Sequence, residues 1–373
     1  MMNRRAIIRC GAFLLASCAA RKILVPDADV VPANAPACKL KEPAPGRWRA
    51  LVLGGGGSTG EFQMGVLPVL ARVFKKFDFF AGVGVGSLHA TVLAQYPDSL
   101  AAGVAVLRDV WAHIQQTSDI FDVPFGGSTM SSLFALANSR DSVYGDGKLK
   151  ELVHDRVYWN KLASHVNWGI EATSMNEGLT YYVTNDEALS ELMNTSPRAF
   201  KPGYRPGKPL YIGSLVHDFI TAAGSVPMIL PPVTIAGQRF CEGGVRRFLP
   251  YPLAVEAYRL ALAKDPSLEA EFVIVDNYTE EIQKEGGTQV QGGQNLLMRT
   301  IKIMTTQVAQ GDLMQGASAL PVAARPVLHA LFPRKDLLLN PQDFDDLALR
   351  AELRNEGTAV ALKAFPGGFC RSS

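Results

Sequence analysis

Short apolar segments alternate along the chain with longer segments of mixed polarity, an order that predicts strands followed by helices. Residues 48–53 (WRALVL) are apolar and partly β-branched, as expected for a buried strand. After a run of glycines, apolar residues recur at helical spacing over 61–76, which predicts a helix with a kink or break at Pro68. Residues 78–83 and 87–95 repeat the order of strand and helix. This alternation predicts an α/β fold.

The later part of the chain adds hairpins and a long helix. Residues 168–186 are typical of two strands joined around Asn176–Gly178, and 233–240 of a second hairpin. Residues 271–277 predict a short buried strand. Residues 294–310 predict a helix with an apolar stripe, and its methionines are expected in the core.

Composition limits the classes of function. The 373 residues are 47% apolar and carry a net charge of +2, which indicates a globular chain and gives no reason to expect a nucleic-acid partner. No uninterrupted apolar run reaches the length of a spanning helix. The five cysteines lack metal-ligand spacing, so no metal or other cofactor is predicted. Unpaired thiols are favoured, although Cys38 and Cys370 would form a disulfide if the two ends met in an oxidising compartment.

The N-terminus is typical of an export signal. Residues 1–17 have a basic start, a short apolar stretch and small residues before Cys18. Residues 15–18 (LASC) resemble the bacterial lipobox, in which the signal is cut before a cysteine that is then acylated. This resemblance implies an exported bacterial lipoprotein that faces the periplasm, most simply on the outer membrane, anchored by acyl chains on Cys18. Residues 18–47 would then be a proline-rich tether. A plain cleaved signal is the alternative.

The glycine run at 54–60 lies between the first strand and its helix. Glycines let backbone N–H groups converge on one point, and a helix N-terminus adds partial positive charge there, so the loop favours an anion or an oxyanion. Gly55, Gly57 and Gly60 also fit the dinucleotide fingerprint, but the acid expected at the end of the second strand is missing. An oxyanion loop built from Gly55, Gly56, Gly57 and Gly60 is therefore the favoured interpretation.

The second strand-to-helix turn reads GVGVG at 82–86. Acyl hydrolases place their serine at such a turn in the pattern G-x-S-x-G. Here Gly84 stands where the serine is expected. Serine catalysis needs a hydroxyl within about 2.6–3.2 Å of a base, and glycine offers none.

Taken together, these blocks resemble the patatin-like phospholipases. The glycine loop followed by Gly65-Val66-Leu67 resembles their oxyanion loop and its helix, and 82–90 resembles their nucleophile turn. Residues 224–232 and 241–250 resemble the two later motifs. The resemblance covers 48–282 and implies a three-layer α/β/α fold with a central, mostly parallel sheet. It leaves 283–373 as a mostly helical extension that packs on the domain, in which 343–362 resembles the family's closing helix.

The resemblance also indicates which residues of this chain stand at the two catalytic positions of the family. The family uses a Ser–Asp pair on lipid acyl esters, and here Gly84 takes the serine position and Glu242 the aspartate position. The resemblance implies a lipid acyl hydrolase of lipid metabolism, a phospholipase A or esterase, whose catalysis is impaired in this chain. Loss of the nucleophile costs about 10⁶ in turnover in a comparable serine hydrolase.

Two other interpretations stay open. Residues 56–60 also fit G-x-S-x-G, so Ser58 could be the nucleophile of an active hydrolase, with His217 or His329 as its base. Alternatively, the chain is a pseudoenzyme that binds lipid or a protein partner without cleavage. His89, on the helix after the turn at 82–86, is predicted to pack against its neighbours.

Overall fold

The computed structural model describes most of the chain beyond the proline-rich segment. The described residues are 37–38, 46–123, 141–162, 166–195, 212–282, 293–320, 326–334, 344–366 and 371–372. The expected signal, Cys18 and nearly all of the expected tether lie outside them. Within the described residues, every helix is too short or too polar to cross a membrane.

In the part of the chain that the structure describes, eight strands form one sheet in the order β6-β7-β4-β3-β2-β8-β9, with β5 beside β4. The strands are β2 (Arg47–Leu53), β3 (Phe79–Gly82), β4 (Asn167–Ser174), β5 (Leu179–Thr184), β6 (Val233–Ile235), β7 (Gln238–Glu242), β8 (Glu269–Val275) and β9 (Val327–Leu331). Neighbours from β4 to β9 pair in parallel, whereas β5 and β7 pair antiparallel with β4. The sheet is therefore mostly parallel, as predicted.

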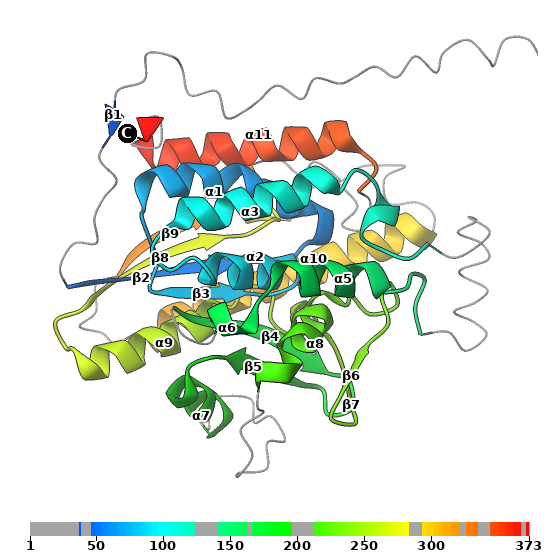
Figure 1. Ribbon diagram of the computed structural model, residues 1–373, viewed down its shortest axis with the longest axis horizontal. Helices are drawn as coiled ribbons and strands as arrows, with labels where there is room; N and C mark the ends of the chain where they lie inside the picture. The colour runs from blue at the N-terminus through cyan, green and yellow to red at the C-terminus, as the bar shows by residue number, and fades with distance from the viewer. Residues whose placement is uncertain are drawn as a thin grey trace, which may run out of the picture. The chain divides into compact units, whose positions relative to one another are not determined.

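Helices cover both faces of this sheet (Figure 1). The longer helices are α1 (Glu61–Val73), α2 (Val85–Ala94), α3 (Leu100–His113), α5 (Gly147–Arg156), α7 (Glu187–Thr195), α8 (Ile212–Gly224), α9 (Tyr251–Lys264), α10 (Gly293–Ala319) and α11 (Leu347–Ala364). Helices α1, α2, α3, α5, α8 and α11 share one core cluster, and α7, α9 and α10 share the other.

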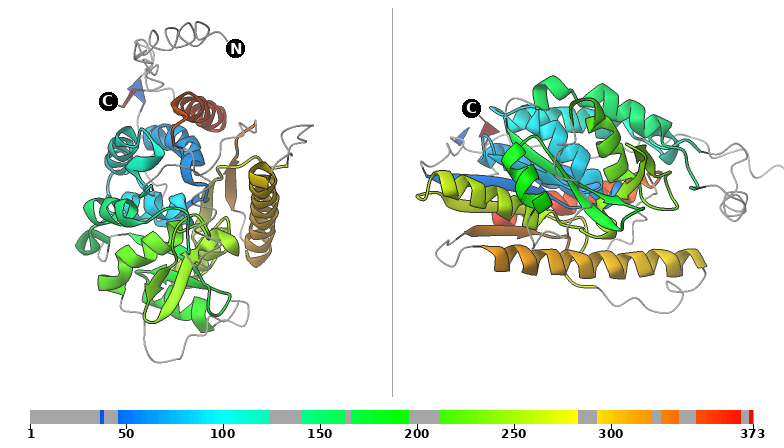
Figure 2. Two further views of the ribbon diagram at one scale, coloured as in Figure 1. Left: turned by 90° about the vertical axis from the view of Figure 1, so that its right-hand side faces the viewer. Right: turned by 90° about the horizontal axis from the view of Figure 1, so that it is seen from below.

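Strand β2 supplies both clusters because successive side chains point to opposite faces of a sheet. Leu51 and Leu53 belong to one cluster, whereas Ala50 and Val52 belong to the other. Figure 2 shows α10 on the far side of β9 from α1 and α11. This arrangement confirms the three-layer α/β/α fold.

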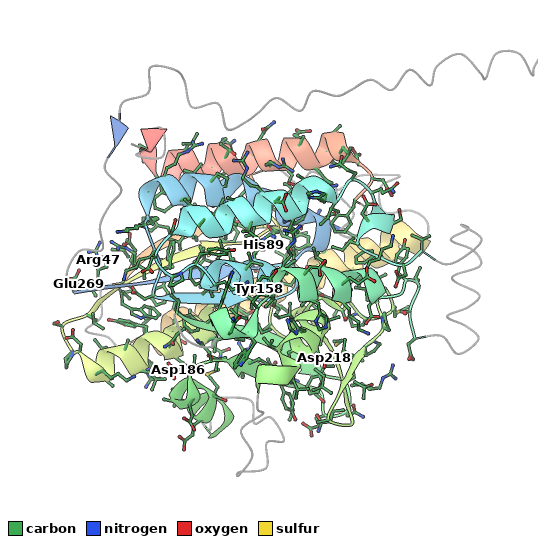
Figure 3. The ribbon with its side chains drawn as sticks, in the orientation of Figure 1. Arg47, His89, Tyr158, Asp186, Asp218 and Glu269 are labelled. Atoms are coloured by element: carbon green, nitrogen blue, oxygen red, sulfur yellow. The ribbon has the colours of Figure 1, made fainter. Side chains whose placement is uncertain are left out.

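The carboxyl ends of the parallel strands carry the loops of interest. Arg47 and Glu269 begin β2 and β8 and lie side by side, 3.0 Å apart between Nη2 and Oε2, at the amino edge (Figure 3). The glycine loop leaves the opposite end of β2, and the turn into α2 leaves the same end of its neighbour β3. Loops at this edge form the ligand sites of open α/β sheets.

The C-terminal segment is part of the fold. Helix α11 lies along α1, and a β-carbon at Gly65 or Gly357 would come within 1.9 or 2.1 Å of a backbone oxygen of the other helix. At the start of α1, the fully buried Glu61 accepts bonds from Arg350 at 2.8 Å and from Arg354 at 2.8 Å. Strand β9, which sequence analysis did not predict, extends the sheet beside β8.

Three local expectations need correction or completion. Helix α1 continues through Pro68 without a break, so the proline costs the helix only the bond that its nitrogen cannot donate. Met304 is 60% exposed, because this face of α10 points away from the sheet, so the expectation of a core methionine is wrong there.

Cys241 is buried and unpaired. Strands β1 (Ala37–Cys38) and β10 (Arg371–Ser372) bring the two ends of residues 37–372 together, and Cys370 lies outside the described residues.

Candidate functional site

The turn between β3 and α2 holds Gly84 in a conformation that side chains rarely adopt. Its φ is 57° and its ψ is −131°. A non-glycine residue in such a region costs on the order of 1–3 kcal/mol. A β-carbon placed on Gly84 would lie 2.5 Å from Glu242 Oε1 and 2.9 Å from Gly55 Cα. A side chain at position 84 would therefore point at Glu242, as the register of the nucleophile turn requires.

Glu242 ends β7 and is fixed through its backbone. Its N–H donates to the Ser225 carbonyl at 2.9 Å, and the residue pairs across the ladder with Ala172 of β4. Its side chain is almost fully buried, and this burial raises the pKa of the carboxyl to about 8. Among the described residues, no hydrogen bond or nearby charge offsets the cost of burying it. At neutral pH Glu242 is therefore mostly a neutral carboxylic acid.

The extra methylene of glutamate decides where this carboxyl lies. Glutamate reaches about 1.5 Å further than aspartate. Glu242 Oε1 lies against Gly84 and also 3.2 Å from a β-carbon position on Gly55. The carboxyl thus occupies the space in which a serine side chain would stand. Positions 84 and 242 are therefore sterically linked, a relation that the sequence alone did not reveal.

The glycine loop is held by side chains on its outer side. Asn277, just after β8, donates from Nδ2 to the carbonyls of Gly54 at 3.2 Å and Gly55 at 2.8 Å. Gln63 of α1 donates to the Gly54 carbonyl at 2.9 Å. Gly56 and Gly57 line the pocket described below. Gly60 precedes α1, and a β-carbon there would meet Trp111 at 2.9 Å.

A buried chain of hydrogen bonds extends from Gln63 into the core. The Trp111 indole donates to His89 Nε2 at 2.8 Å, and His89 Nδ1 lies 2.7 Å from Gln63 Oε1. Because an indole can only donate, Nε2 must accept and Nδ1 must carry the proton. Burial lowers the pKa of His89 to about 3, which keeps it neutral. His89, seen in the interior in Figure 3, therefore packs as predicted and also helps to position the glycine loop.

An apolar pocket opens beside Gly84, and the space between its atoms, open solvent at the mouth included, is about 990 Å³. Its wall is built by apolar side chains of α2, α3, α5 and α8, with Ile301 of α10 and Phe344 before α11. Glu242 is the one acidic or basic residue among the described residues that line it. A wall of this kind, with a few polar groups at one point, fits a hydrocarbon chain with a polar end.

The structure places Ser58 elsewhere. Ser58 is fully buried in the 3₁₀ turn Gly57–Gly60 and is not among the described residues that line the pocket. His217 Nε2 contacts the Val157 carbonyl at 2.8 Å, and His329 Nε2 lies 3.4 Å from Glu271 Oε1 on β8. The fold thus brings Gly84, Glu242 and the glycine loop together, whereas the Nε2 atoms of His217 and His329 contact the Val157 carbonyl and Glu271.

Sequence analysis missed the residues that hold the loop. Asn277 is the last residue of the predicted strand 271–277, and Gln63 and His89 are polar residues within apolar helical segments. Polar residues in such positions are usually paired when buried. That rule was a usable signal for the two helix residues, but their mutual contact depends on how α1 and α2 pack.

A sharp turn after one parallel strand, a glycine loop after its neighbour and a carboxyl between them define the scaffold of an α/β acyl hydrolase. The family model of the patatin-like phospholipases matches residues 51–255. This match spans more than half of the chain, so the chain belongs to that family. It therefore has the scaffold of a lipid hydrolase, and its family acts on lipid esters.

Two further comparisons add little. The crystal structure of VipD from Legionella pneumophila is similar with a TM-score of 0.37 and 10% sequence identity, over 88% of this chain and 69% of that chain. The comparison with curated proteins found no match.

Proposed function

We propose that this chain is a membrane-tethered lipid-binding protein that keeps the patatin-like pocket and has lost ordinary serine hydrolysis. One observation carries the proposal: a β-carbon on Gly84 would lie 2.5 Å from Glu242 Oε1. The nucleophile is missing, and the base occupies its place. Without a hydroxyl there, the Ser–Asp mechanism has no attacking atom.

The pocket itself supports a lipid ligand. Its apolar wall lies against the glycine loop and the start of α2, so an acyl chain fits where the family holds its substrates. Among the described lining residues, Thr305 and Tyr278 carry hydroxyls. The Thr305 hydroxyl donates to the Lys302 carbonyl of its own helix at 3.1 Å, so it offers no activated nucleophile.

The proposed location rests on the sequence of the N-terminus. Cleavage before Cys18 and its acylation would anchor the protein to a membrane facing the periplasm, with the outer membrane favoured. The proline-rich segment would then hold the domain above the lipid surface. Mass spectrometry of the protein from its membrane fraction tests this step, because the mature chain must begin at an acylated Cys18.

Hydrolysis assays with a short-chain nitrophenyl ester and with phospholipid vesicles test the loss of catalysis. We expect the natural chain to stay near the rate of the buffer, and the Ser58→Ala variant to be indistinguishable from it. Turnover by the natural chain that Ser58→Ala abolishes would refute the proposal and establish Ser58 as the nucleophile. Binding of a fluorescent phospholipid analogue without cleavage is the expected positive result.

A further inference from the structure

The pocket has an apolar wall and a single polar end. Glu242 lies at that end together with Gly84, the N-cap of α2, with Val85, its first residue, and with Gly56 and Gly57 of the glycine loop. Everything else named on the wall of α2, α3, α5 and α8 is apolar. A ligand that fills this space has one polar head and a hydrocarbon chain.

The start of α2 favours a negatively charged head. The helix dipole places partial positive charge at this end. The Gly86 and Ser87 N–H groups already donate to the Val83 and Gly84 carbonyls at 2.9 and 3.0 Å, so the dipole, rather than these two groups, attracts the head. Helix α2 has ten residues, and its N-terminus opens on the pocket at Gly84 and Val85. A cationic head would meet the wrong end of this dipole.

The second observation is the buried carboxyl beside that helix end. Glu242 is 9% exposed, lines the pocket, and has no hydrogen-bond partner for its carboxyl among the described residues. Burial raises the pKa of this carboxyl to about 8, so at neutral pH it carries a proton that it can donate. A buried donor without a partner points to an acceptor on the ligand.

Other ionisable groups on neighbouring elements do not supply that partner. They are the Cys241 thiol on β7, Glu171 on β4, Asp276 after β8, and the ion pair of Arg247 with Asp312 of α10. Asp276 accepts from the Tyr278 N–H at 3.2 Å, and Asp312 accepts from Arg247 at 2.9 Å. None of these groups lines the pocket.

We propose that the pocket holds a free fatty acid as its carboxylate, with the head at the start of α2 accepting a hydrogen bond from the Glu242 carboxyl and the chain along the apolar wall. The inference rests on the proposed loss of hydrolysis, because it needs the neutral Glu242 in the place of a nucleophile. An O–H group that donates to a carboxylate forms a short, charge-assisted bond. An ester or an alcohol accepts the same bond without the charge and binds less tightly.

The pH dependence of binding distinguishes this head group. The protonated fraction of Glu242 falls above pH 8, and the apparent affinity falls with that fraction. For a pKa of about 8, this predicts a loss of about 30-fold in affinity between pH 7 and pH 9.5. In Glu242→Gln the amide keeps a donor that does not titrate, so the affinity should change less than about threefold over this range.

Isothermal titration tests the inference, with dodecanoate below its micelle concentration and with methyl dodecanoate and dodecanol below their solubility limits. The protein is the full 373-residue chain, produced without export so that Cys18 is not acylated. We expect dodecanoate to bind at least about tenfold more tightly than either neutral ligand at pH 7. Glu171→Gln is the matched control, because it removes a buried carboxyl with a raised pKa that does not line the pocket. It should keep the pH dependence of the natural chain.

The outcomes separate the two proposals. If the neutral ligands bind as tightly as dodecanoate and pH has no effect, the fatty-acid head is wrong and the lipid-binding function stands. If Glu242→Gln keeps the full pH dependence, Glu242 is not the donor and the inference fails. If none of the three ligands binds, both the inference and the lipid-binding function are refuted.

Discussion

Restoring serine at position 84 should require a second substitution at Glu242. In Gly84→Ser the new β-carbon would lie 2.5 Å from Glu242 Oε1, closer than two such atoms can stand. The glutamate must rotate away, and the hydroxyl loses its base. Shortening the acid by one methylene in Gly84→Ser/Glu242→Asp withdraws the carboxyl by about 1.5 Å. That leaves room for a hydroxyl at the catalytic distance of about 2.6–3.2 Å.

The magnitude follows from coupling between residues in contact. Such pairs typically couple by about 0.5–3 kcal/mol. A coupling of about 1–3 kcal/mol corresponds to about 5- to 150-fold in rate. We therefore expect the double variant to hydrolyse a nitrophenyl ester about 5- to 150-fold faster than Gly84→Ser alone.

The control separates steric relief from the return of a base. Gly84→Ser/Glu242→Ala also removes the close contact with Glu242 Oε1 and keeps the same 2.9 Å approach to Gly55 Cα, but it leaves no carboxyl to accept the proton of the hydroxyl. It should stay near the rate of Gly84→Ser. Equal rates for Gly84→Ser and the double variant with aspartate would refute the steric link between the two positions.

Three further predictions concern the interior. Arg350→Met removes one of the two partners of the fully buried Glu61 and should lower the free energy of unfolding in urea by about 3 kcal/mol. Arg334→Met removes an exposed guanidinium that pairs with Glu356 and should cost clearly less. Equal losses would contradict the role of Glu61. His89→Leu leaves the Trp111 indole and Gln63 Oε1 without their buried partner and should lower the free energy of unfolding by at least about 2 kcal/mol in the same assay. The control His113→Leu replaces an exposed histidine and should change stability by less than about 0.5 kcal/mol. Unchanged stability in His89→Leu would show that the chain of hydrogen bonds is dispensable. Burial raises the pKa of Glu171 to about 8, above the unfolded value of about 4.3, so the folded chain binds more protons between these pH values. The stability that this group contributes is fully present below about pH 4 and is lost as pH rises to about 8. Urea unfolding across this range should show a smaller loss in Glu171→Gln, and an unchanged slope would mean that Glu171 is ionised in the folded protein.

The fold was largely predictable because its signals are local. The alternation of strand and helix, the two hairpin turns and the glycine loop each depend on a few neighbouring residues. Strand β9 escaped prediction because its residues alternate between half-buried and exposed, which resembles a loop or a short helix segment in a single sequence. The exposed Met304 was missed for a related reason, since a sequence does not say which face of α10 meets the sheet.

The candidate site was only partly predictable. The order of the motifs was enough to propose Gly84 and Glu242. In the structure, a β-carbon on Gly84 would lie 2.5 Å from Glu242 Oε1. The position of the Glu242 carboxyl depends on side-chain reach across two loops, and no local pattern encodes it. The same holds for Asn277, which reaches the glycine loop from a strand 222 residues further along the chain.

The absence of an activated nucleophile is tested most directly by a fluorophosphonate probe, which forms a covalent bond with an activated serine. The full chain is incubated with the probe and its intact mass is measured, with Gly84→Ser/Glu242→Asp in parallel. Our account predicts that the natural chain keeps its unmodified mass and that the double variant gains one adduct at position 84. An adduct on the natural chain, at Ser58 or any other residue, would contradict it.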